Sequence, residues 1–301
     1  MSQLVGDVTR KKIKELEVMV ADVRVETPDT VTLVLFTGND RLDYKPGHFC
    51  TIDPHQFSAL ERFTAYLEDV KGKKEPPRAY SLSSAPHEKY VAITIKEEQY
   101  VSGKTKYPPL LSPLLVRQVP AGTRMHITGF TGPYTLPDDI EAKTDHLVHV
   151  VAGSGAVPNF SFVKHALHTG MKLKHTFICS NRTWADVCFK KELADLERAH
   201  PDKLTVVHTL TRETDDTLFD ETLSGPQRVY RGRISRDILQ KHIPDPSSCI
   251  VYACGPAVSV HDKAAAKAAG KAPEPRFMET VLEQLTAIGV ADARIKRESY
   301  G

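Results

Sequence analysis

The feature that most constrains the fold is a change in the hydrophobic rhythm of the chain near residue 140. Before this point, apolar residues come in short β-branched runs such as Val18–Val25 and Thr30–Phe36, which flank the turn-forming pair Pro28-Asp29. After it, apolar runs alternate with helical patterns of roughly 10–15 residues. The first pattern is typical of a small antiparallel barrel, and the second predicts βαβ units around a parallel sheet. The expected fold class is therefore β followed by α/β.

The predicted elements follow from these runs and from the turn signals between them. In the first half we expect strands at Val18–Val25, Thr30–Phe36, Phe49–Ile52, Arg78–Leu82, Tyr90–Lys96 and Arg124–Thr128, with a helix at Leu110–Val116. In the second half we expect strands at Leu147–Val151, Leu173–Ile178, Leu204–Leu210 and Ile250–Ala253 and from Ile295, and helices at Asn159–His168, Phe189–Ala199 and Ser235–His242. Two stretches resemble insertions. His55–Pro77 has a helical part at Gln56–Val70, and Ala257–Pro275 begins as an Ala/Lys-rich helix. Each is either solvated decoration or a docking surface.

The length of 301 residues suggests two domains, at roughly 100–200 residues each. We place them at 14–140 and 145–301, joined by a polar linker within Pro137–Asp145. A net charge of +2 provides no global field for a polyanion, so nucleic acid is not an expected partner. No apolar run reaches the roughly 18–20 residues that span a bilayer. The polar start, Met1–Lys14, carries no apolar signal core. We therefore expect a cytoplasmic protein, without a membrane partner, and a monomer.

The cysteines exclude two classes of metal site. Five are present, scattered as Cys50, Cys179, Cys188, Cys249 and Cys254, and none follows C-x2-C zinc spacing or the C-x4-C-x2-C run of plant-type iron–sulfur proteins. We expect no metal site and no fused cluster-bearing domain.

The first motif with chemical meaning is Arg78-Ala79-Tyr80-Ser81. A guanidinium binds phosphate through parallel hydrogen bonds, a phenol ring packs against an isoalloxazine, and a hydroxyl reaches the ring nitrogen that accepts hydride. Taken alone, these four residues are as consistent with an ordinary strand as with a flavin site. Ser112 lies farther along and is predicted to cap a helix whose N–H groups face a pyrophosphate.

The second half contains two further motifs at strand ends. Gly153-Ser154-Gly155-Ala156-Val157-Pro158 joins a buried strand to a helix, where two glycines let the backbone approach a dinucleotide and Pro158 opens the helix. The third glycine of G-x-G-x-x-G is absent, which disfavours a standard Rossmann dehydrogenase. Cys254, in Cys254-Gly255-Pro256, ends a parallel strand, where side chains point into the ligand crevice. The other four cysteines are interpreted as small buried hydrophobes.

Together and in this order, these motifs resemble the ferredoxin–NADP reductase superfamily over about residues 14–301. The resemblance implies that Arg78, Tyr80 and Ser81 bind FAD and that Gly153, Gly155 and Pro158 receive the NAD(P) pyrophosphate. It also implies that Cys254, Gly255 and Pro256 lie beside the nicotinamide. Lys96 and Ser112 are assigned to the same cofactor site. FMN, which some relatives use, is the alternative to FAD.

The end of the chain fits the resemblance as well. Glu298-Ser299-Tyr300 matches the E-x-aromatic ending of plant-type members, with Gly301 as one extra residue. The resemblance implies that Tyr300 covers the flavin until nicotinamide displaces it, and that Glu298 assists proton movement. The alternative is a frayed tail. The sequence departs from the family in its second flavin motif, usually G-x-x-S/T, which here is Pro109-Leu110-Leu111-Ser112 and lacks the glycine.

The choice of nucleotide depends on the group that meets the adenosine ribose. An acidic residue there binds a free 2′-hydroxyl, whereas arginine accommodates a 2′-phosphate. The second strand of this half ends in Cys179-Ser180-Asn181-Arg182, with the first carboxylate at Asp186. We therefore expect NADP(H) rather than NAD(H), with Arg182 on the phosphate and Ser180 or Arg212 assisting.

These expectations describe a ferredoxin–NADP reductase-like oxidoreductase. Hydride passes from NAD(P)H to FAD, with Ser81, Cys254, Glu298 and Tyr300 as the catalytic set, and single electrons then leave for a separate ferredoxin, flavodoxin or oxygenase component. Lys71, Lys73 and Lys74 are candidates for a basic patch that receives an acidic acceptor, or are a solvated face. Two alternatives stay open: a non-catalytic flavin-binding subunit of a larger complex, and a free ferric or flavin reductase.

Overall fold

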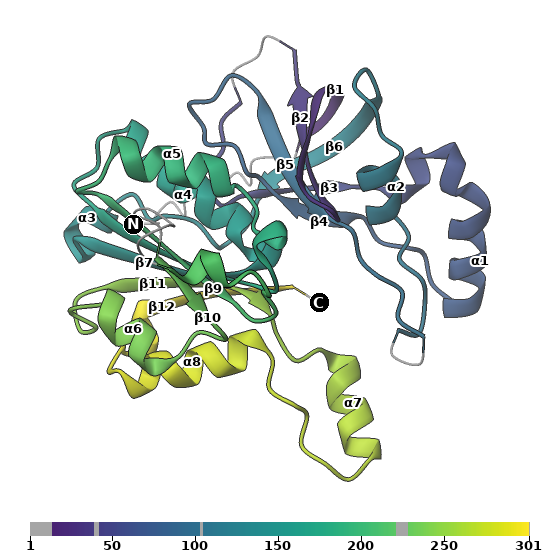
Figure 1. Ribbon diagram of the computed structural model, residues 1–301. Helices are drawn as coiled ribbons and strands as arrows, with labels where there is room; N and C mark the ends of the chain where they lie inside the picture. The colour runs from purple at the N-terminus through teal and green to yellow at the C-terminus, as the bar shows by residue number, and fades with distance from the viewer. Residues whose placement is uncertain (1–13, 39–41, 103–104, 221–227, 301) are drawn as a thin grey trace, which may run out of the picture.

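The computed structural model describes residues 14–38, 42–102, 105–220 and 228–300. The first half forms a six-stranded antiparallel sheet in the order β4-β3-β6-β1-β2-β5 (Figure 1). A bridge between Leu82 and Ile93 joins β4 to β5 and closes this sheet into a barrel. Its strands are β1 (Lys14–Thr27), β2 (Thr30–Phe36), β3 (Phe49–Ile52), β4 (Arg78–Ser81), β5 (Val91–Lys96) and β6 (Arg124–Thr131). Its helices are α1 (Glu61–Lys71), α2 (Ser112–Arg117) and the 3₁₀ turns Pro54–Gln56 and Ser58–Leu60.

The second half forms a six-stranded parallel sheet in the order β10-β9-β8-β7-β11-β12. Its strands are β7 (His146–Ala152), β8 (Lys174–Asn181), β9 (Leu204–Leu210), β10 (Arg228–Arg231), β11 (Ile250–Pro256) and β12 (Ile295–Tyr300). Its helices are α3 (Ile140–Lys143), α4 (Ala156–His168), α5 (Lys190–Ala199), α6 (Arg236–His242), α7 (Val260–Ala268) and α8 (Phe277–Ala287), and its 3₁₀ turns are Gly153–Gly155, Trp184–Asp186, Asp216–Phe219 and Asp292–Arg294. The order reverses between β7 and β11, the position at which parallel sheets bind ligands.

The cores account for both patterns in the sequence. One cluster of buried residues fills the barrel, and two clusters cover the opposite faces of the parallel sheet. In β7, Leu147 and Val151 pack on one face and Val148 and Val150 on the other, which is why apolar residues occupy both faces of this strand. The connecting segment also contributes, since Tyr134 packs in the second cluster. The predicted β and α/β architecture is confirmed.

Several predicted boundaries differ from those of the structure. The insertion helix begins at Glu61 rather than Gln56, because the Gln56 side chain is held by β6, with Nε2 donating to the His126 carbonyl at 3.0 Å and Oε1 accepting from the His126 N–H at 2.6 Å. Pro158 does not open α4 but is its third residue, because the 3₁₀ turn of the glycine loop leads into the helix at Ala156.

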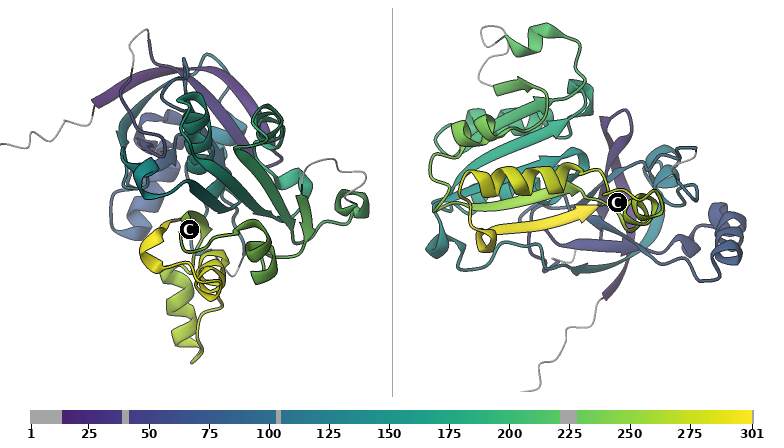
Figure 2. Two further views of the ribbon diagram at one scale, coloured as in Figure 1. Left: turned by 90° about the vertical axis from the view of Figure 1, so that its left-hand side faces the viewer. Right: turned by 90° about the horizontal axis from the view of Figure 1, so that it is seen from below.

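The two halves pack against one another along α4 and α5 (Figure 2). The Ser161 hydroxyl, on α4, donates to the Ser84 carbonyl at 2.7 Å, and Glu88 pairs with Lys164 at 2.5 Å. The Phe189 N–H, just before α5, donates to the Glu26 carboxylate at 3.2 Å. These buried and half-buried polar contacts fix the orientation of the halves. None of the helices that the structure describes is long and apolar enough to cross a membrane.

Candidate functional site

A cavity of about 770 Å³ lies between the barrel and the parallel sheet. It brings together residues that are far apart in the chain: β4 and β5 line the barrel side, and the glycine loop after β7 and the end of β11 line the other side. The predicted site residues that line it are Arg78, Tyr80, Ser81, Lys96, Ser112, Gly153, Arg182, Pro256 and Tyr300. The other predicted site residues do not line it: Gly155, Pro158, Cys254, Gly255 and Glu298.

On the barrel side, other side chains and the backbone of the protein hold Arg78 in place. Its guanidinium donates to the Glu75 carboxylate at 2.6 Å and to the Pro76 carbonyl at 2.5 Å. Glu75 is buried and also accepts from Lys71 at 2.5 Å. Burial raises the pKa of Glu75, but the hydrogen bonds from Lys71 and Arg78 outweigh it and leave this pKa below its ordinary value. A charged Glu75 therefore fixes the guanidinium at the cavity wall.

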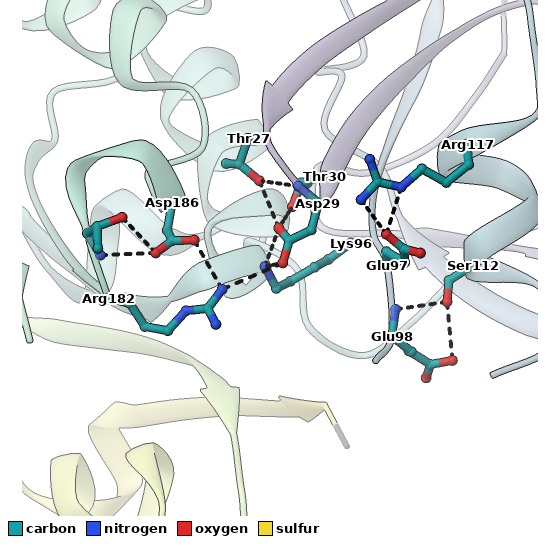
Figure 3. Close-up of polar contacts among 11 residues, drawn as sticks. Thr27, Asp29, Thr30, Lys96, Glu97, Glu98, Ser112, Arg117, Arg182 and Asp186 are labelled. Atoms are coloured by element: carbon teal, nitrogen blue, oxygen red, sulfur yellow. Dashed lines mark hydrogen bonds and ion pairs between the residues drawn. The ribbon is translucent and has the colours of Figure 1, made fainter. Parts of the chain in front are cut away.

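Ser112 does not have the predicted capping role. It is the first residue of α2, and no side chain caps this helix at Leu111. The Ser112 hydroxyl instead accepts from the Glu98 N–H at 3.0 Å and lies 3.3 Å from a Glu98 carboxylate oxygen (Figure 3). The hydroxyl thus ties the segment after β5 to α2, and the helix starts at Ser112 itself, one residue earlier than a Ser112 cap would require. Ser112 still lines the cavity.

The glycine loop has the bare backbone that a dinucleotide requires. Gly153 has φ +53°, and a Cβ added there would meet nothing within 4 Å. Gly155 is packed in the opposite way, since an added Cβ would lie 2.2 Å from the Cys254 carbonyl oxygen. The Asn159 amide donates to the Gly155 carbonyl at 3.3 Å and so anchors the loop from below. The loop is therefore open toward the cavity and close-packed on the sheet, which fits a bound pyrophosphate.

The end of the chain reaches the same cavity. β12 pairs in parallel with β11, with Cys254 opposite Glu298 and Pro256 opposite Tyr300. Tyr300 lines the cavity, and its buried hydroxyl has no hydrogen-bond partner among the described residues. Burial raises the pKa of this hydroxyl well above its ordinary value, and the nearby Cys254 and Glu298 raise it further. Of the four predicted catalytic residues, Ser81 and Tyr300 line the cavity, whereas Cys254 and Glu298 pair with each other on the neighbouring strands β11 and β12 without lining it.

Cys254 does not point into the crevice as predicted. It has no exposed surface, and its Sγ lies 3.8 Å from a Glu298 carboxylate oxygen. The neighbouring strand β12 places Glu298 opposite Cys254 and Tyr300 opposite Pro256, and it is Tyr300 and Pro256 that line the cavity. Burial raises the pKa of the Cys254 thiol and raises that of Glu298 to about 7. A neutral thiol thus stands beside a carboxyl group that titrates near neutrality.

Arg182 and Lys96, which were assigned to different ligands, converge on one residue (Figure 3). The Lys96 ammonium lies 2.6 Å from both carboxylate oxygens of Asp29. Arg182 lies 3.1 Å from Asp186 and 3.6 Å from Asp29. Asp29 is in the turn between β1 and β2, and nothing in the sequence distinguished it from an ordinary turn residue. An ionic chain thus crosses from the barrel to the parallel sheet along one wall of the cavity.

Sequence reasoning missed two arginines of the cavity wall. Arg276 precedes α8 and pairs with Asp262 of α7 at 2.7 Å. Arg233 follows β10, is exposed, and forms no ion pair within the described parts of the chain. Neither lies in a recognisable motif. Ser180 lines the cavity as expected, whereas Arg212, the other predicted assistant of Arg182, does not.

The remaining cysteines are all buried, which agrees with their interpretation as hydrophobes. Over the ranges that the structure describes, no group of three or more His, Cys, Asp or Glu side chains is placed to hold a metal ion.

Comparison with known proteins supports this description. Residues 150–262 match the family described as the oxidoreductase NAD-binding domain. The chain is 33% identical over 201 residues to the ferredoxin reductase component of 3-ketosteroid-9-alpha-monooxygenase from Mycolicibacterium smegmatis, an alignment that covers 65% of this chain and 50% of that protein. The chain thus spans about half the length of this relative.

Solved structures show the same fold over nearly the whole chain. The FAD/NAD-binding domain of nitric oxide dioxygenase from Vibrio cholerae superposes with a TM-score of 0.68 at 23% identity, covering 95% of this chain and 98% of that one. Ferredoxin–NADP+ reductase from Plasmodium falciparum does so with a TM-score of 0.64 at 16% identity, covering 95% and 96%. The chain therefore has the fold of these proteins, a closed barrel followed by a parallel sheet, with a cavity between the two halves that the predicted flavin and nucleotide motifs line.

Proposed function

We propose that this protein is a flavoprotein reductase that moves hydride from NADPH to FAD and then passes single electrons to a separate acceptor protein. The observation that carries the proposal is that the Arg78–Ser81 motif, the glycine loop at Gly153 and Tyr300 line one cavity between the two halves. The name of the Mycolicibacterium relative, a ferredoxin reductase component, supports a protein acceptor. We propose 14–140 and 145–301 as the flavin and nucleotide domains.

The residues present fit FAD. Arg78, Tyr80 and Ser81 present a guanidinium, a ring and a hydroxyl along one strand, and Lys96 and Ser112 line the same wall. When bound, FAD accepts a hydride from the nicotinamide and releases its two electrons one at a time. The Arg78 guanidinium would hold a phosphate, since Glu75 already fixes its direction. The Ser81 hydroxyl would donate a hydrogen bond to the ring nitrogen that receives the hydride.

Glu298 is suited to hold and release the proton that accompanies electron transfer. A carboxyl group with a pKa of about 7 exists in both protonation states near neutral pH. Burial keeps Cys254 neutral beside it, so the thiol can donate a hydrogen bond to the carboxylate without adding charge. Tyr300 would occupy the place of the nicotinamide until the nucleotide displaces it, which requires only that its ring leave the cavity wall.

We propose NADP(H) as the nucleotide because positive groups dominate the far end of the cavity. Arg182 and Arg233 both line it; the carboxylates near Arg182 are Asp186 and Asp29, and Asp29 is already paired with Lys96. The ratio of kcat/KM for NADPH to that for NADH should exceed about ten, since a charged hydrogen bond is worth roughly 1.5–3 kcal/mol. Arg182→Ala should shrink this ratio, and Arg212→Ala, outside the cavity, should not. A wild-type ratio below one would contradict the assignment.

The experiment that tests the function is anaerobic stopped-flow reduction of the purified protein by NADPH and NADH. The protein should be yellow, and its flavin absorbance should bleach on mixing. Ser81→Ala should slow this bleaching while leaving flavin bound, whereas Ser83→Ala removes a buried hydroxyl outside the cavity and serves as the control. A colourless protein that takes up no flavin would overturn the proposal. Equal rates for the two serine variants would remove Ser81 from the mechanism.

A further inference from the structure

We propose that Lys71, at the end of the inserted helix α1, is a positioning residue for the phosphate of the bound flavin and acts on it through Glu75 and Arg78. The inference rests on the proposed function, because it requires that Arg78 hold a flavin phosphate. It gives the insertion at His55–Pro77 a role within the barrel, which is neither the predicted solvated decoration nor the predicted docking surface. It also removes Lys71 from the predicted basic patch.

The first observation is that the Lys71 side chain turns into the protein rather than toward solvent. Its ammonium group lies 2.5 Å from a carboxylate oxygen of Glu75 and 4.7 Å from the centre of the Tyr107 ring. Only 17% of the Lys71 side chain is exposed, and only 2% of that of Glu75. Lysines ordinarily keep the ammonium group in water, as the exposed Lys73 and Lys74 can. Lys71 is instead engaged with a buried carboxylate.

The second observation is that the turn after α1 brings Glu75 back to this lysine. The helix ends at Lys71 because Gly72 adopts φ +65°, and the Gly72 N–H donates to the Glu68 carbonyl at 2.8 Å. The Glu68 carboxylate accepts the Glu75 N–H at 2.8 Å. Leu67 has no exposed surface and anchors α1 in the barrel core. The last turn of α1 therefore holds both the backbone and the side chain of Glu75.

The third observation is that Glu75 connects Lys71 to the cavity wall. The second carboxylate oxygen of Glu75 accepts from the Arg78 guanidinium at 2.6 Å. Arg78 lines the cavity, whereas Lys71 and Glu75 are not among the lining residues. Another guanidinium N–H donates to the Pro76 carbonyl at 2.5 Å. A guanidinium has further N–H donors, and these two bonds fix the direction in which those donors point toward a ligand.

The fourth observation concerns charge and explains why the lysine is needed. Burial raises the pKa of Glu75, but the hydrogen bonds from Lys71 and Arg78 bring it below its ordinary value, so the carboxylate stays charged. Glu75 and Arg78 alone form a neutral pair, whereas Lys71 restores a positive charge to the group and leaves the guanidinium available to a phosphate. Loss of Lys71 makes the surroundings of Arg78 more negative whatever the other charges of the wall, such as Glu98. It also removes an anchor from Glu75, so both effects weaken phosphate binding.

The test replaces Lys71 in the full-length protein and measures flavin binding rather than activity. Dissociation constants are determined by flavin fluorescence for FAD and for riboflavin, which has the same ring system but no phosphate. Lys71→Met keeps the length of the side chain and removes its charge. It should weaken FAD binding at least about fivefold, since a direct hydrogen bond to a charged group contributes more than this and Lys71 acts through a neighbour, and should leave riboflavin binding within about twofold. Lys71→Arg keeps the charge and should retain the FAD affinity of the wild type.

The matched control is Lys73→Met, which removes an equal charge from an exposed position just beyond α1 and should change neither dissociation constant. In an Arg78→Ala background, Lys71→Met should have no further effect on FAD binding. Adding Glu75→Gln to Lys71→Met removes the unpaired carboxylate and should move the FAD dissociation constant back toward that of the wild type. NADP+ binding should not change in any Lys71 variant, because α1 lies on the side of the barrel away from the parallel sheet (Figure 1).

Equal losses of FAD and riboflavin affinity in Lys71→Met would assign this lysine to the stability of the barrel alone and overturn the proposal. So would an unchanged FAD dissociation constant, a further loss in the Arg78→Ala background, or no recovery when Glu75→Gln is added. A wild-type protein that binds riboflavin as tightly as FAD would also overturn it, because no phosphate would then be held. A wild-type protein that binds neither flavin would instead overturn the proposed function.

Discussion

The raised pKa of Glu298 makes a quantitative prediction about stability. Burial raises this pKa from 4.5 to about 7, so the folded protein binds the proton more tightly than the unfolded chain. The stability that this proton contributes is present in full below pH 4.5 and is lost as the pH rises to 7. Removing the carboxyl group by Glu298→Gln, which keeps the shape of the side chain, should abolish this pH-dependent loss.

The size of the effect follows from linkage. One pKa unit corresponds to about 1.4 kcal/mol. The shift of the Glu298 pKa from 4.5 to about 7 should therefore lower the free energy of unfolding of the wild type by about 2.5 kcal/mol between pH 5 and pH 8. The neighbours do not interfere, because burial raises the pKa values of Cys254 and Tyr300 and both stay neutral over this range. The free energy of unfolding of Glu298→Gln, relative to the wild type, should therefore rise by about that amount across the interval.

The assay is urea unfolding of the flavin-loaded protein, followed by far-ultraviolet circular dichroism at half-unit steps from pH 5 to pH 8. Taking the difference between variant and wild type cancels the histidines, which titrate in both. Glu283→Gln, which removes an exposed carboxylate from α8, controls for the loss of one charge. If the Glu298→Gln difference is flat with pH, or falls as the pH rises, then the carboxyl group is not buried as described and its assignment to proton handling loses its basis.

Three further predictions concern the packing around the cavity. Gly155→Ala should weaken NADP+ binding at least about tenfold in titrations, because the new methyl group would lie 2.2 Å from a carbonyl oxygen of β11. Gly153→Ala adds a methyl group that meets no other atom, so it tests only the strain of a positive φ, and it should weaken NADP+ binding less than Gly155→Ala does. Ser161→Ala leaves the buried Ser84 carbonyl without its donor and should lower the free energy of unfolding by about 1–3 kcal/mol in urea titrations. Asn159→Leu should lower the free energy of unfolding by about the same amount, because it removes the oxygen that lies 2.9 Å from Nδ1 of the buried His149. An unchanged midpoint of urea unfolding in either variant would refute the corresponding estimate.

Much of the fold could be predicted because local pattern and tertiary environment agree. The bounds of Thr30–Phe36 and Leu204–Leu210 coincide with β2 and β9, since each β-branched or apolar run ends where the chain must turn. The order of the motifs placed the barrel before the parallel sheet and identified residues on both sides of the cavity. These features could be predicted because they depend on residues that are close in the chain, or because the carboxyl ends of parallel strands lie at the same edge of a sheet.

What could not be predicted depends on how the two halves meet. Asp29 looks like a turn residue until docking brings Arg182 within 3.6 Å of it. Cys254 ends its strand as expected, but the register of β12 decides that Tyr300 rather than the thiol lines the cavity. Ser112 occupies a position that a cap could take, and only the fold of the 97–99 segment shows that it binds Glu98 instead. Such contacts join residues distant in sequence, where no periodicity exists to indicate them.

The burial of the cysteines has a practical consequence. All five thiols lie inside the protein, and burial raises the pKa of each, so almost no thiolate is available at neutral pH. Maleimides and nitroxide reagents should therefore leave the native protein unmodified. A single cysteine introduced by Lys267→Cys would be the sole reactive thiol, without first removing any native one. A fluorescent or spin label can thus be attached at a single position on α7, and distances from this label to a bound partner can then be measured directly.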